Sequence, residues 1–382
     1  MSMVGKRRVS FLTGNMKSEN IRKEKVFVGL SGGVDSSVAA LLLKKKGYDV
    51  VGVYMKNWSD PRDLKTGHCT WIQDRRDAMR VASQLGIPFL EMDFEREYRK
   101  RVVQYLFDEY RLGRTPNPDV MCNKIVKFDL FLKKSLKLGA SYIATGHYAK
   151  ISGRAGHYAL RIPYDKRKDQ TYFLYSLTQL QLSKTLFPLS EMTKSEVRRL
   201  ARKKKLITAE KKDSQGICFV GEVPIKEFLS KKLPEKKGRV VDTSGNMIGE
   251  HNGAYFYTIG QRHGFSIFNQ TTDSKPHYVI EKDVKKNILI VDEGLNSKRL
   301  AKHEVLLKDV HWVSGQPPKF PLQCKARIRH GQPLQSALFK SVSKSNSGHL
   351  SGCFTKPQKG VAAGQSVVLY RRGACLGGGV II

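Results

Sequence analysis

The hydrophobic positions near the start of the chain change from a short continuous run to helical spacing. Val26, Phe27 and Val28 form a β-prone run that predicts a buried strand over residues 25–30. Val38 and Leu41 then lie on one face of a predicted helix over residues 36–47, which ends at a glycine. A second apolar strand is predicted over residues 49–55. Together these segments predict one βαβ unit.

The same alternation continues to about residue 150. It predicts strands over 87–92 and 142–144 and helices over 77–85, 98–110 and 128–138. This order is typical of a doubly wound parallel sheet, which binds its ligands at the carboxyl ends of the strands. A basic helix is predicted over 184–206.

The pattern changes at residue 238, where short strands with Gly or Asn turns begin. These strands are predicted over 239–241, 255–259, 277–281, 287–291, 324–329, 335–339, 366–370 and 374–381. From residue 304 onward the chain is almost entirely strand, which predicts a small β-barrel or sandwich. We therefore expect four parts: a basic disordered arm over 1–23, an α/β domain over 24–225, a central mixed domain over 226–302 and a C-terminal β-barrel domain over 303–382.

The turn after the first predicted strand contains Ser-Gly-Gly-Val-Asp-Ser, residues 31–36. Gly32 and Gly33 let the backbone approach a ligand, and their N–H groups can bind an anion together with the helix N-terminus. The Walker pattern and the dinucleotide pattern G-x-G-x-x-G are both absent. A purely structural turn would explain a lone Gly pair, but this longer pattern is more specific. It predicts a phosphate loop, and it resembles the pyrophosphate loop of N-type ATP pyrophosphatases, which split ATP between its α and β phosphates.

Charge adds a second expectation. The 382 residues carry a formal net charge of +34, which indicates a polyanionic partner, most simply nucleic acid. No apolar run approaches the roughly 20 residues of a membrane helix, and no secretory signal precedes the first strand. The 6 cysteines show neither C-x-x-C nor zinc-ligand spacing. We therefore expect a cytoplasmic protein with reduced thiols, no membrane association and no dedicated metal ligands.

Two of the cysteines lie in unusual surroundings. Cys122 follows Pro116 and Pro118, which predict a rigid loop without helix that holds Asp119 near the thiol. Nearby lysines favour its thiolate. Cys218 lies in KKDSQGICFVGE, where an inert thiol in a buried strand explains the pattern equally well.

Segments from residue 26 to the C-terminus, taken in order, resemble the tRNA-specific 2-thiouridylase family, known as MnmA or TrmU. They are LSGGVDSSVAALLL, GVYMKNW, GRTPNPDVMCNK, ATGHYAK, KDQTYFLY, LFPLSEMTK, KDSQGICFVGE, YTIGQR and GQSVVLYRRGACLGGG. The resemblance implies that residues 24–225 are a pyrophosphatase-type catalytic domain. It implies that ATP, with Mg²⁺, adenylates the C2 oxygen of the wobble uridine of certain tRNAs. A cysteine persulfide then supplies the sulfur, which gives 2-thiouridine, AMP and pyrophosphate. The persulfide in turn implies a sulfur donor protein, either a cysteine desulfurase or a sulfur-relay protein.

The resemblance also implies roles for single residues. Cys218 would carry the persulfide, Cys122 would be the second thiol, able to form a disulfide with Cys218 during turnover, and Asp119 would be the acid/base catalyst. The implied nucleotide-binding residues are Gly29, Leu30, Ser31, Gly32, Gly33, Val34, Asp35, Ser36, Met55 and Gly146. The implied tRNA-binding residues are Asn117, Pro118, Asp119, His147, Lys168, Asp169, Gln170, Arg329, His330 and Gln365.

Two other functions stay open at this point. Another N-type ATP pyrophosphatase, such as an amide-forming synthetase or argininosuccinate synthase, shares the loop but needs neither Cys122 nor Cys218. A basic RNA-binding protein with a relic nucleotide site would need no catalytic thiol. Residues 1–23 lie outside the family pattern and leave a transit peptide open, and His277 stands where the family often has tryptophan.

Overall fold

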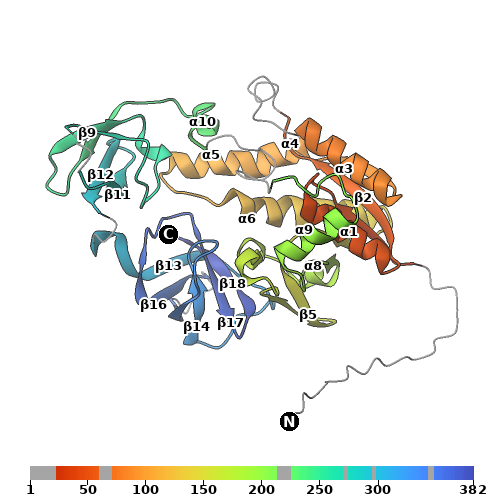
Figure 1. Cartoon of the computed structure of the whole chain (residues 1–382). Coiled ribbons are helices and arrows are strands. Elements are labelled where there is room, and N and C mark those ends of the chain that lie inside the picture. The colour runs from red at the N-terminus through yellow and green to blue at the C-terminus, as the bar shows by residue number, and fades with distance from the viewer. Residues whose placement is uncertain (1–22, 60–70, 213–224, 270–273, 295–297, 343–347) are drawn as a thin grey trace, which may run out of the picture.

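The computed structural model describes residues 23–59, 71–212, 225–269, 274–294, 298–342 and 348–382 (Figure 1). The predicted arm over 1–23, apart from its last residue, and the segment that contains Cys218 lie outside these residues. Within the described residues, no helix is long and apolar enough to cross a membrane.

The first layer is the predicted parallel sheet, which the structure confirms. Its strand order is β3-β2-β1-β4-β7, and every pairing in it is parallel. The strands are β1 (Lys25–Gly29), β2 (Asp49–Lys56), β3 (Phe89–Asp93), β4 (Tyr142–Ala144) and β7 (Thr185–Leu186). Since β1 is central, the Ser-Gly-Gly loop leaves the sheet where the strand order reverses, which is the usual ligand position in this architecture.

Helices cover both faces of this sheet because alternate side chains of its strands point to opposite sides. Val26 and Val28 pack with α1 (Val34–Lys45), α3 (Trp71–Leu85) and α9 (Lys194–Lys203). Phe27 and Val53 pack with two long helices on the other face. The first of these comprises α4 (Glu95–Tyr98), a π-helical turn η1 (Arg99–Val103) and α5 (Gln104–Arg111). The second comprises α6 (Pro118–Cys122), a π-helical stretch η2 (Asn123–Leu130) and α7 (Phe131–Lys137).

Some local predictions were wrong, for identifiable reasons. The prolines do not exclude helix before Cys122, because Pro118 occupies the first helical position, where its missing N–H costs nothing. The basic helix predicted over 184–206 is shorter: Thr193 caps α9 in a capping box with Glu196. The strand predicted over 255–259 is largely a 3₁₀ turn, η5 (Ala254–Phe256). Short elements η3 (Lys166–Lys168), η4 (Thr171–Leu174) and α8 (Gln179–Ser183) connect the α/β layer to the barrel.

A second sheet follows α10 (Ile225–Ser230) and has the order β10-β9-β8-β12-β11. Its strands are β8 (Gly238–Val241), β9 (Met247–His251), β10 (Ser266–Ile267), β11 (His277–Asp283) and β12 (Ile288–Glu293). Phe228 of α10 stacks on Phe107 of α5 with ring centroids 5.6 Å apart. This contact packs α10, the helix that precedes the central sheet, against the first layer.

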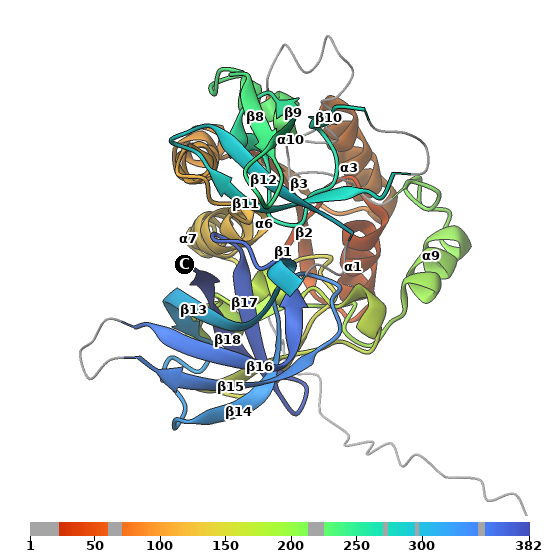
Figure 2. The same cartoon turned by 90° about the vertical axis from the view of Figure 1, so that its left-hand side faces the viewer.

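The C-terminal strands form the predicted barrel, and the barrel interpretation holds rather than the sandwich. After η6 (Lys298–Leu300), β13 (Ala301–Trp312), β16 (Leu350–Lys359), β15 (Gln335–Ser341), β14 (Leu322–Arg327), β17 (Ser366–Arg371) and β18 (Ala374–Ile381) pair in that order, and β18 returns to β13. The hairpin β5 (Lys150–Arg154) and β6 (His157–Arg161) pairs with β18, so a segment from the α/β layer extends the barrel sheet. In Figure 2 the barrel lies below and the central sheet above.

Candidate functional site

The phosphate loop has the shape that its glycines predict. Gly32 has φ +73°, and a Cβ atom at this position would overlap the carbonyl oxygen of Asp74 at the start of α3. Gly33 is the N-cap of α1. The Ser36 hydroxyl donates to the Gly33 carbonyl (3.0 Å) and accepts from the Ser31 N–H (3.2 Å), which fixes the turn. The helix begins at Val34, two residues earlier than predicted, so its positive end lies directly at the loop.

The remaining predicted nucleotide residues lie beside this loop. A Cβ atom at Gly146 would lie 2.7 Å from the Ser36 nitrogen, and one at Gly29 would lie 3.0 Å from Cε of Met55. The first approach places Gly146 against the loop, and the second places Met55 beside the end of β1, from which the loop starts. Leu30 and Val34 are 1% and 3% exposed and point into the core, so only their backbone can face a ligand.

A lysine that the sequence analysis did not single out lies at the loop. Nζ of Lys194, at the start of α9, donates to both carboxylate oxygens of Asp35 at 2.8 Å. The Tyr148 hydroxyl donates to the same carboxylate at 2.9 Å. The loop lacks the Walker lysine, and Lys194 supplies a cation there from 159 residues away in the chain.

A second cluster joins α3 to the chain that leads toward Cys218. Nζ of Lys211 lies 2.6 Å from Oδ1 of Asp74 and 2.7 Å from Oδ2 of Asp77. Burial lowers the pKa of Lys211, but hydrogen bonds and charge from the two carboxylates outweigh it and raise the pKa above its ordinary value. Cys218 itself lies in residues 213–224, outside the described residues.

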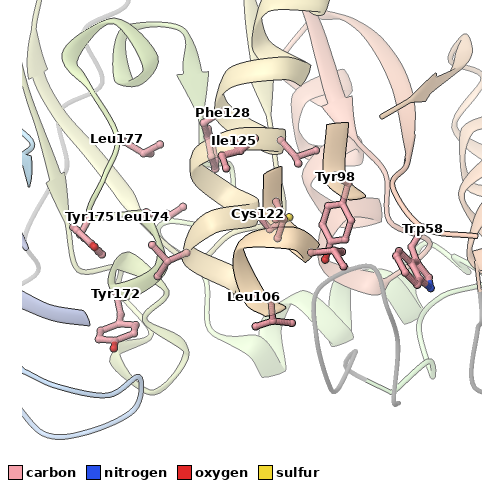
Figure 3. Packing of buried hydrophobic residues seen from close by; sticks show 14 of the residues in the cluster. Trp58, Tyr98, Leu106, Cys122, Ile125, Phe128, Tyr172, Leu174, Tyr175 and Leu177 are labelled. Carbon is pink, nitrogen blue, oxygen red and sulfur yellow. The ribbon is translucent and has the colours of Figure 1, made fainter. Parts of the chain in front are cut away.

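The turn before Cys122 starts a helix. The Asn117 side chain accepts from the Val120 N–H at 3.2 Å and caps α6, which places Asp119 in the first turn. Cys122 is fully buried (0% exposed). Figure 3 shows it in the packed layer with Tyr98, Leu106 and Ile125. Its thiol is therefore covered by the side chains of neighbouring helices and does not lie on an open loop.

Barrel and central-sheet residues both hold this turn. The Thr115 N–H donates to the Ala363 carbonyl (2.7 Å), and its hydroxyl contacts that of Thr258 (3.0 Å). Nε2 of Gln365, predicted to contact tRNA, donates to the Thr115 carbonyl at 2.7 Å. The turn before α6, the barrel and the central sheet thus meet at one junction. A cavity of about 260 Å³ at this junction is lined by Thr258, Ile259, Gly260, Gln261, Arg329 and Gln365.

The predicted tRNA residues divide into those at this junction and those covered inside it. Arg329 donates to the Gly360 carbonyl (2.8 Å), and His330 packs on Phe173 with ring centroids 4.5 Å apart. Burial lowers the pKa of His330, and the hydrogen bond to the Asp169 carbonyl (3.0 Å) and, less strongly, the charge of Asp119 oppose that shift only in part. Lys168 is partly exposed in η3.

Three further predicted tRNA residues make internal contacts. Asp169 is 3% exposed and pairs with Arg327 of β14. The Gln170 side chain accepts from the Tyr148 N–H at 2.8 Å. His147 is buried, its Nδ1 lies 2.8 Å from the Thr145 hydroxyl, and burial, then Lys127, lowers its pKa well below the ordinary value. The expectation that these three contact tRNA stays a prediction.

Among the residues that the structure describes, no group of three or more His, Cys, Asp or Glu side chains could hold a metal ion. Mg²⁺ in nucleotide enzymes usually needs only one or two carboxylates, because phosphates and water complete its shell. Asp35 fits that need, since its partly exposed carboxylate lies in the first turn of α1 beside the phosphate loop.

Comparisons with known proteins follow the three layers of the structure. Family models match residues 24–222 ("tRNA methyl transferase HUP domain"), 226–293 ("tRNA methyl transferase PRC-barrel domain") and 302–381 ("Aminomethyltransferase beta-barrel domain").

Curated relatives match nearly the whole chain. Proteins named tRNA-specific 2-thiouridylase MnmA from Streptococcus mutans and Alkaliphilus oremlandii are 49% and 47% identical to this chain. Each alignment covers 94% of this chain, with 95% and 96% of the relatives. The protein of that name from Geobacillus thermodenitrificans is 46% identical over 94% of both chains. A solved 4-thiouridine synthetase–RNA complex with bound ATP is 21% identical over 55% of this chain and 50% of its own, with a TM-score of 0.35, too remote to bear on function.

Proposed function

The chain belongs to the tRNA-specific 2-thiouridylase family, and we propose how its residues make 2-thiouridine at the wobble position of tRNA. The enzyme is a tRNA sulfurtransferase that uses ATP. The observation that carries the proposal is the phosphate loop at the carboxyl end of β1, connected by side-chain contacts to the junction that holds Asn117 and Asp119. Tyr148 makes the first part of that connection, because its hydroxyl donates to Asp35 and its backbone pairs with Gln170. η4, which directly follows Gln170, then packs against α6, the helix that contains Asp119.

The first step activates a poor leaving group. The C2 oxygen of uracil attacks the α phosphorus of ATP, an O–P bond forms, the bond to the β-phosphate oxygen breaks and pyrophosphate leaves. Backbone N–H groups of Gly32 and Gly33 and the N-terminus of α1 bind the departing phosphates. Lys194 exchanges its contact with Asp35 for one with phosphate oxygens. Asp119, in the first turn of α6, lies at the junction where it can orient the base and move its N3 proton.

Mg²⁺, when bound, shields the negative charge of the phosphates, and Asp35 would hold it. Release of Asp35 from Lys194 then leaves the carboxylate for the metal and the ammonium for the phosphates. The Asp35–Lys194 pair therefore supplies the carboxylate that would hold Mg²⁺ and the ammonium group that contacts the phosphates.

The second step replaces oxygen by sulfur. The terminal sulfur of a Cys218 persulfide attacks C2, a C–S bond forms, and the C2–O bond breaks as AMP leaves with the original oxygen. The Cys122 thiolate then attacks Sγ of Cys218, which releases the thiocarbonyl and leaves a Cys122–Cys218 disulfide. A dithiol reductant must reduce that disulfide before the next turnover. If Cys122 instead attacks Sγ of Cys218 before the C–S bond forms, the persulfide S–S bond breaks and its terminal sulfur leaves as sulfide bound in the site. That sulfide then attacks C2, AMP leaves, and the same Cys122–Cys218 disulfide results.

Cys122 is placed by helix packing. Its side chain is fully buried at the end of α6, where the π-helical stretch η2 begins. π-helical segments commonly mark functional positions in helices. We propose that the Cys122 thiol acts from this packed position in the sulfur-transfer step.

The family-model descriptions name a methyl transferase, whereas the curated relatives are named 2-thiouridylases. The phosphate loop favours thiolation, because ATP cleavage activates the base oxygen and a methyl transfer has no use for it. A cytoplasmic location, a cysteine desulfurase or relay protein as sulfur donor, and the domain limits at residues 225 and 302 are also part of the proposal.

The test uses Cys122→Ser and Cys218→Ser with Cys353→Ser as the matched control, because Cys353 is an exposed cysteine on the barrel. Enzyme in excess over tRNA is incubated with ATP, Mg²⁺ and inorganic polysulfide, so that each molecule reacts at most once and no reductant is needed, and tRNA nucleosides are measured. We expect Cys353→Ser to form 2-thiouridine at the wild-type rate. Each of the other two should form none while still adenylating tRNA. Wild-type rates in either catalytic variant would refute the mechanism.

A further inference from the structure

The chain that leads toward Cys218 is fixed against the phosphate loop. The Thr208 hydroxyl, 1% exposed, donates to the Ser37 hydroxyl in α1 at 3.0 Å. Nη1 of Arg198 donates to the carbonyl oxygens of Ala209 and Lys211, each at 3.0 Å. These contacts hold the backbone of residues 208–211 beside the first turn of α1.

Lys211 extends this attachment to the other wall of the loop. Its ammonium bridges Asp74 and Asp77, and Nε2 of Gln73 holds the second oxygen of Asp77 at 2.7 Å. Asp74 is the residue whose carbonyl lies against Gly32. Lys211 therefore ties the incoming chain to the turn of α3 that touches the phosphate loop.

Comparison with the neighbouring Lys212 shows how the surroundings of Lys211 differ from those of an ordinary surface lysine. Lys212 carries the same charge, but it is exposed. Lys211 is instead partly buried and sits between two carboxylates, an arrangement with fixed geometry. Ion pairs of this kind contribute little to stability, because desolvation offsets much of the attraction. Fixed geometry is therefore the more important consequence of the cluster.

We propose that Lys211 is a positioning residue for the sulfur-transfer step, which anchors the chain leading to Cys218 beside the bound nucleotide through Asp74 and Asp77. This inference rests on the proposed function. A chain spans at most about 3.6 Å per residue, so its attachment point limits where a thiol a few residues later can reach. Anchoring that point next to the adenylated base raises the effective concentration of the persulfide at C2.

The two chemical steps should respond differently to loss of the anchor. Adenylation forms the O–P bond and needs the phosphate loop, Asp35 and Lys194. Sulfur transfer forms the C–S bond, breaks the C2–O bond to AMP and needs Cys218 at the base. Only the second step depends on where the chain enters residues 213–224.

The experiment compares Lys211→Met, Lys211→Arg and Asp77→Asn with Lys212→Met, which removes the same charge from the exposed neighbour. Single-turnover reactions use enzyme preloaded with polysulfide sulfur, tRNA and ATP labelled in the α phosphate. Labelled adenylate on tRNA reports the first step, and retardation of thiolated tRNA in a mercury-containing gel reports the second. The KM for ATP is measured from AMP formation.

We expect Lys211→Met to keep adenylation within about threefold of wild type and to slow conversion of adenylate to 2-thiouridine at least about tenfold. Asp77→Asn should slow the same step, and Lys211→Arg should recover most of the rate. A variant that combines Lys211→Met with Asp77→Asn should be no slower than Lys211→Met alone, because both substitutions break the same contact. Lys212→Met should match wild type in both steps.

Equal loss in both steps, or a raised KM for ATP, would overturn the proposal, because it would make Lys211 a structural residue or a phosphate ligand. An unchanged thiolation rate would overturn it too. Where Lys211→Met does not fold, judged by circular dichroism, Asp77→Asn and Lys211→Arg are held to the same criteria. Failure of the proposed function is distinct, since wild-type enzyme would then make adenylate but no 2-thiouridine.

Discussion

Removal of the Arg327 guanidinium should destabilise the barrel strongly, because it leaves a carboxylate buried without its cation. The side chains of Arg327 and Asp169 are 6% and 3% exposed, so water screens neither charge. Asp169 also accepts from the N–H (3.0 Å) and hydroxyl (2.6 Å) of Thr171, and Arg327 lies over the Tyr370 ring at 4.7 Å. The pair thus joins the segment before η4 to β14 and β17.

The magnitude follows from which charge is left behind. Breaking a buried pair by removing one partner typically costs about 3–5 kcal/mol, and here the two hydrogen bonds from Thr171 retain part of the carboxylate's stabilisation. We therefore expect Arg327→Met to lose about 3 kcal/mol of unfolding free energy, which for a domain as small as the barrel lowers its Tm by about 12 °C or more. Adding Asp169→Asn removes the stranded charge, so the double variant should be more stable than Arg327→Met alone.

Urea unfolding followed by circular dichroism measures the free energy, and hydrogen exchange of Ser366–Arg371 localises the effect to β17. Arg371→Met is the matched control, because it removes an exposed arginine from β17, the strand that pairs with β14 and whose exchange is measured. If Asp169 acts only by contacting tRNA, Asp169→Asn and Arg327→Met will weaken tRNA binding without changing the unfolding free energy. That result would refute the structural role of the pair.

Lys194→Met should raise the KM for ATP by about tenfold or more in an AMP-formation assay, since a charge-assisted contact is worth roughly 1.5–3 kcal/mol; an unchanged KM would remove Lys194 from the nucleotide site. Gly32→Ala should abolish adenylation but keep tRNA binding in a filter assay, because φ +73° is strained for alanine and its Cβ would overlap Asp74. Burial, and then Lys127, hold the pKa of His147 well below its ordinary 6.5. Below that pH only the unfolded chain takes up the proton, so stability should fall by about 1.4 kcal/mol per pH unit. Urea unfolding at about pH 7.5 and about pH 5.5 measures this loss of unfolding free energy, which should be smaller in His147→Gln than in wild type. An equal loss in both proteins would contradict the prediction.

The sequence predicted those parts of the site that depend on neighbours in the chain. A buried run followed by Gly32 and Gly33 is enough to indicate a strand, a phosphate turn and a helix, and the parallel sheet follows from repeated alternation. Lys194 and Lys211 could not be found this way. Their partners, Asp35 and Asp74, lie 159 and 137 residues away, and no local pattern specifies such pairings.

The wrong prediction before Cys122 came from applying a rule about proline without regard to its position in the helix. Proline excludes helix interiors but is favoured at the first turn, and Asn117 before Pro118 was the available capping signal for α6. The thiol of Cys122 therefore faces packed helices, where a loop would have exposed it. The contact between the Gln365 amide and the Thr115 carbonyl could not be predicted from local sequence, because only packing of the barrel against the α/β layer brings residues 115 and 365 together.

These contacts bear on which step needs the barrel. Asp35 is held by Lys194 and by the hydroxyl of Tyr148, and Tyr148 is held through its backbone by Gln170. The next residue back, Asp169, is fixed by Arg327 of the barrel. A continuous series of contacts therefore connects the phosphate loop to the barrel. Precise placement of Asp35 and Lys194 for adenylation requires that the residues holding them be rigid. It follows that damage to the barrel at Arg327 should impair adenylation as well as tRNA binding, which a barrel serving only as an RNA clamp would not do.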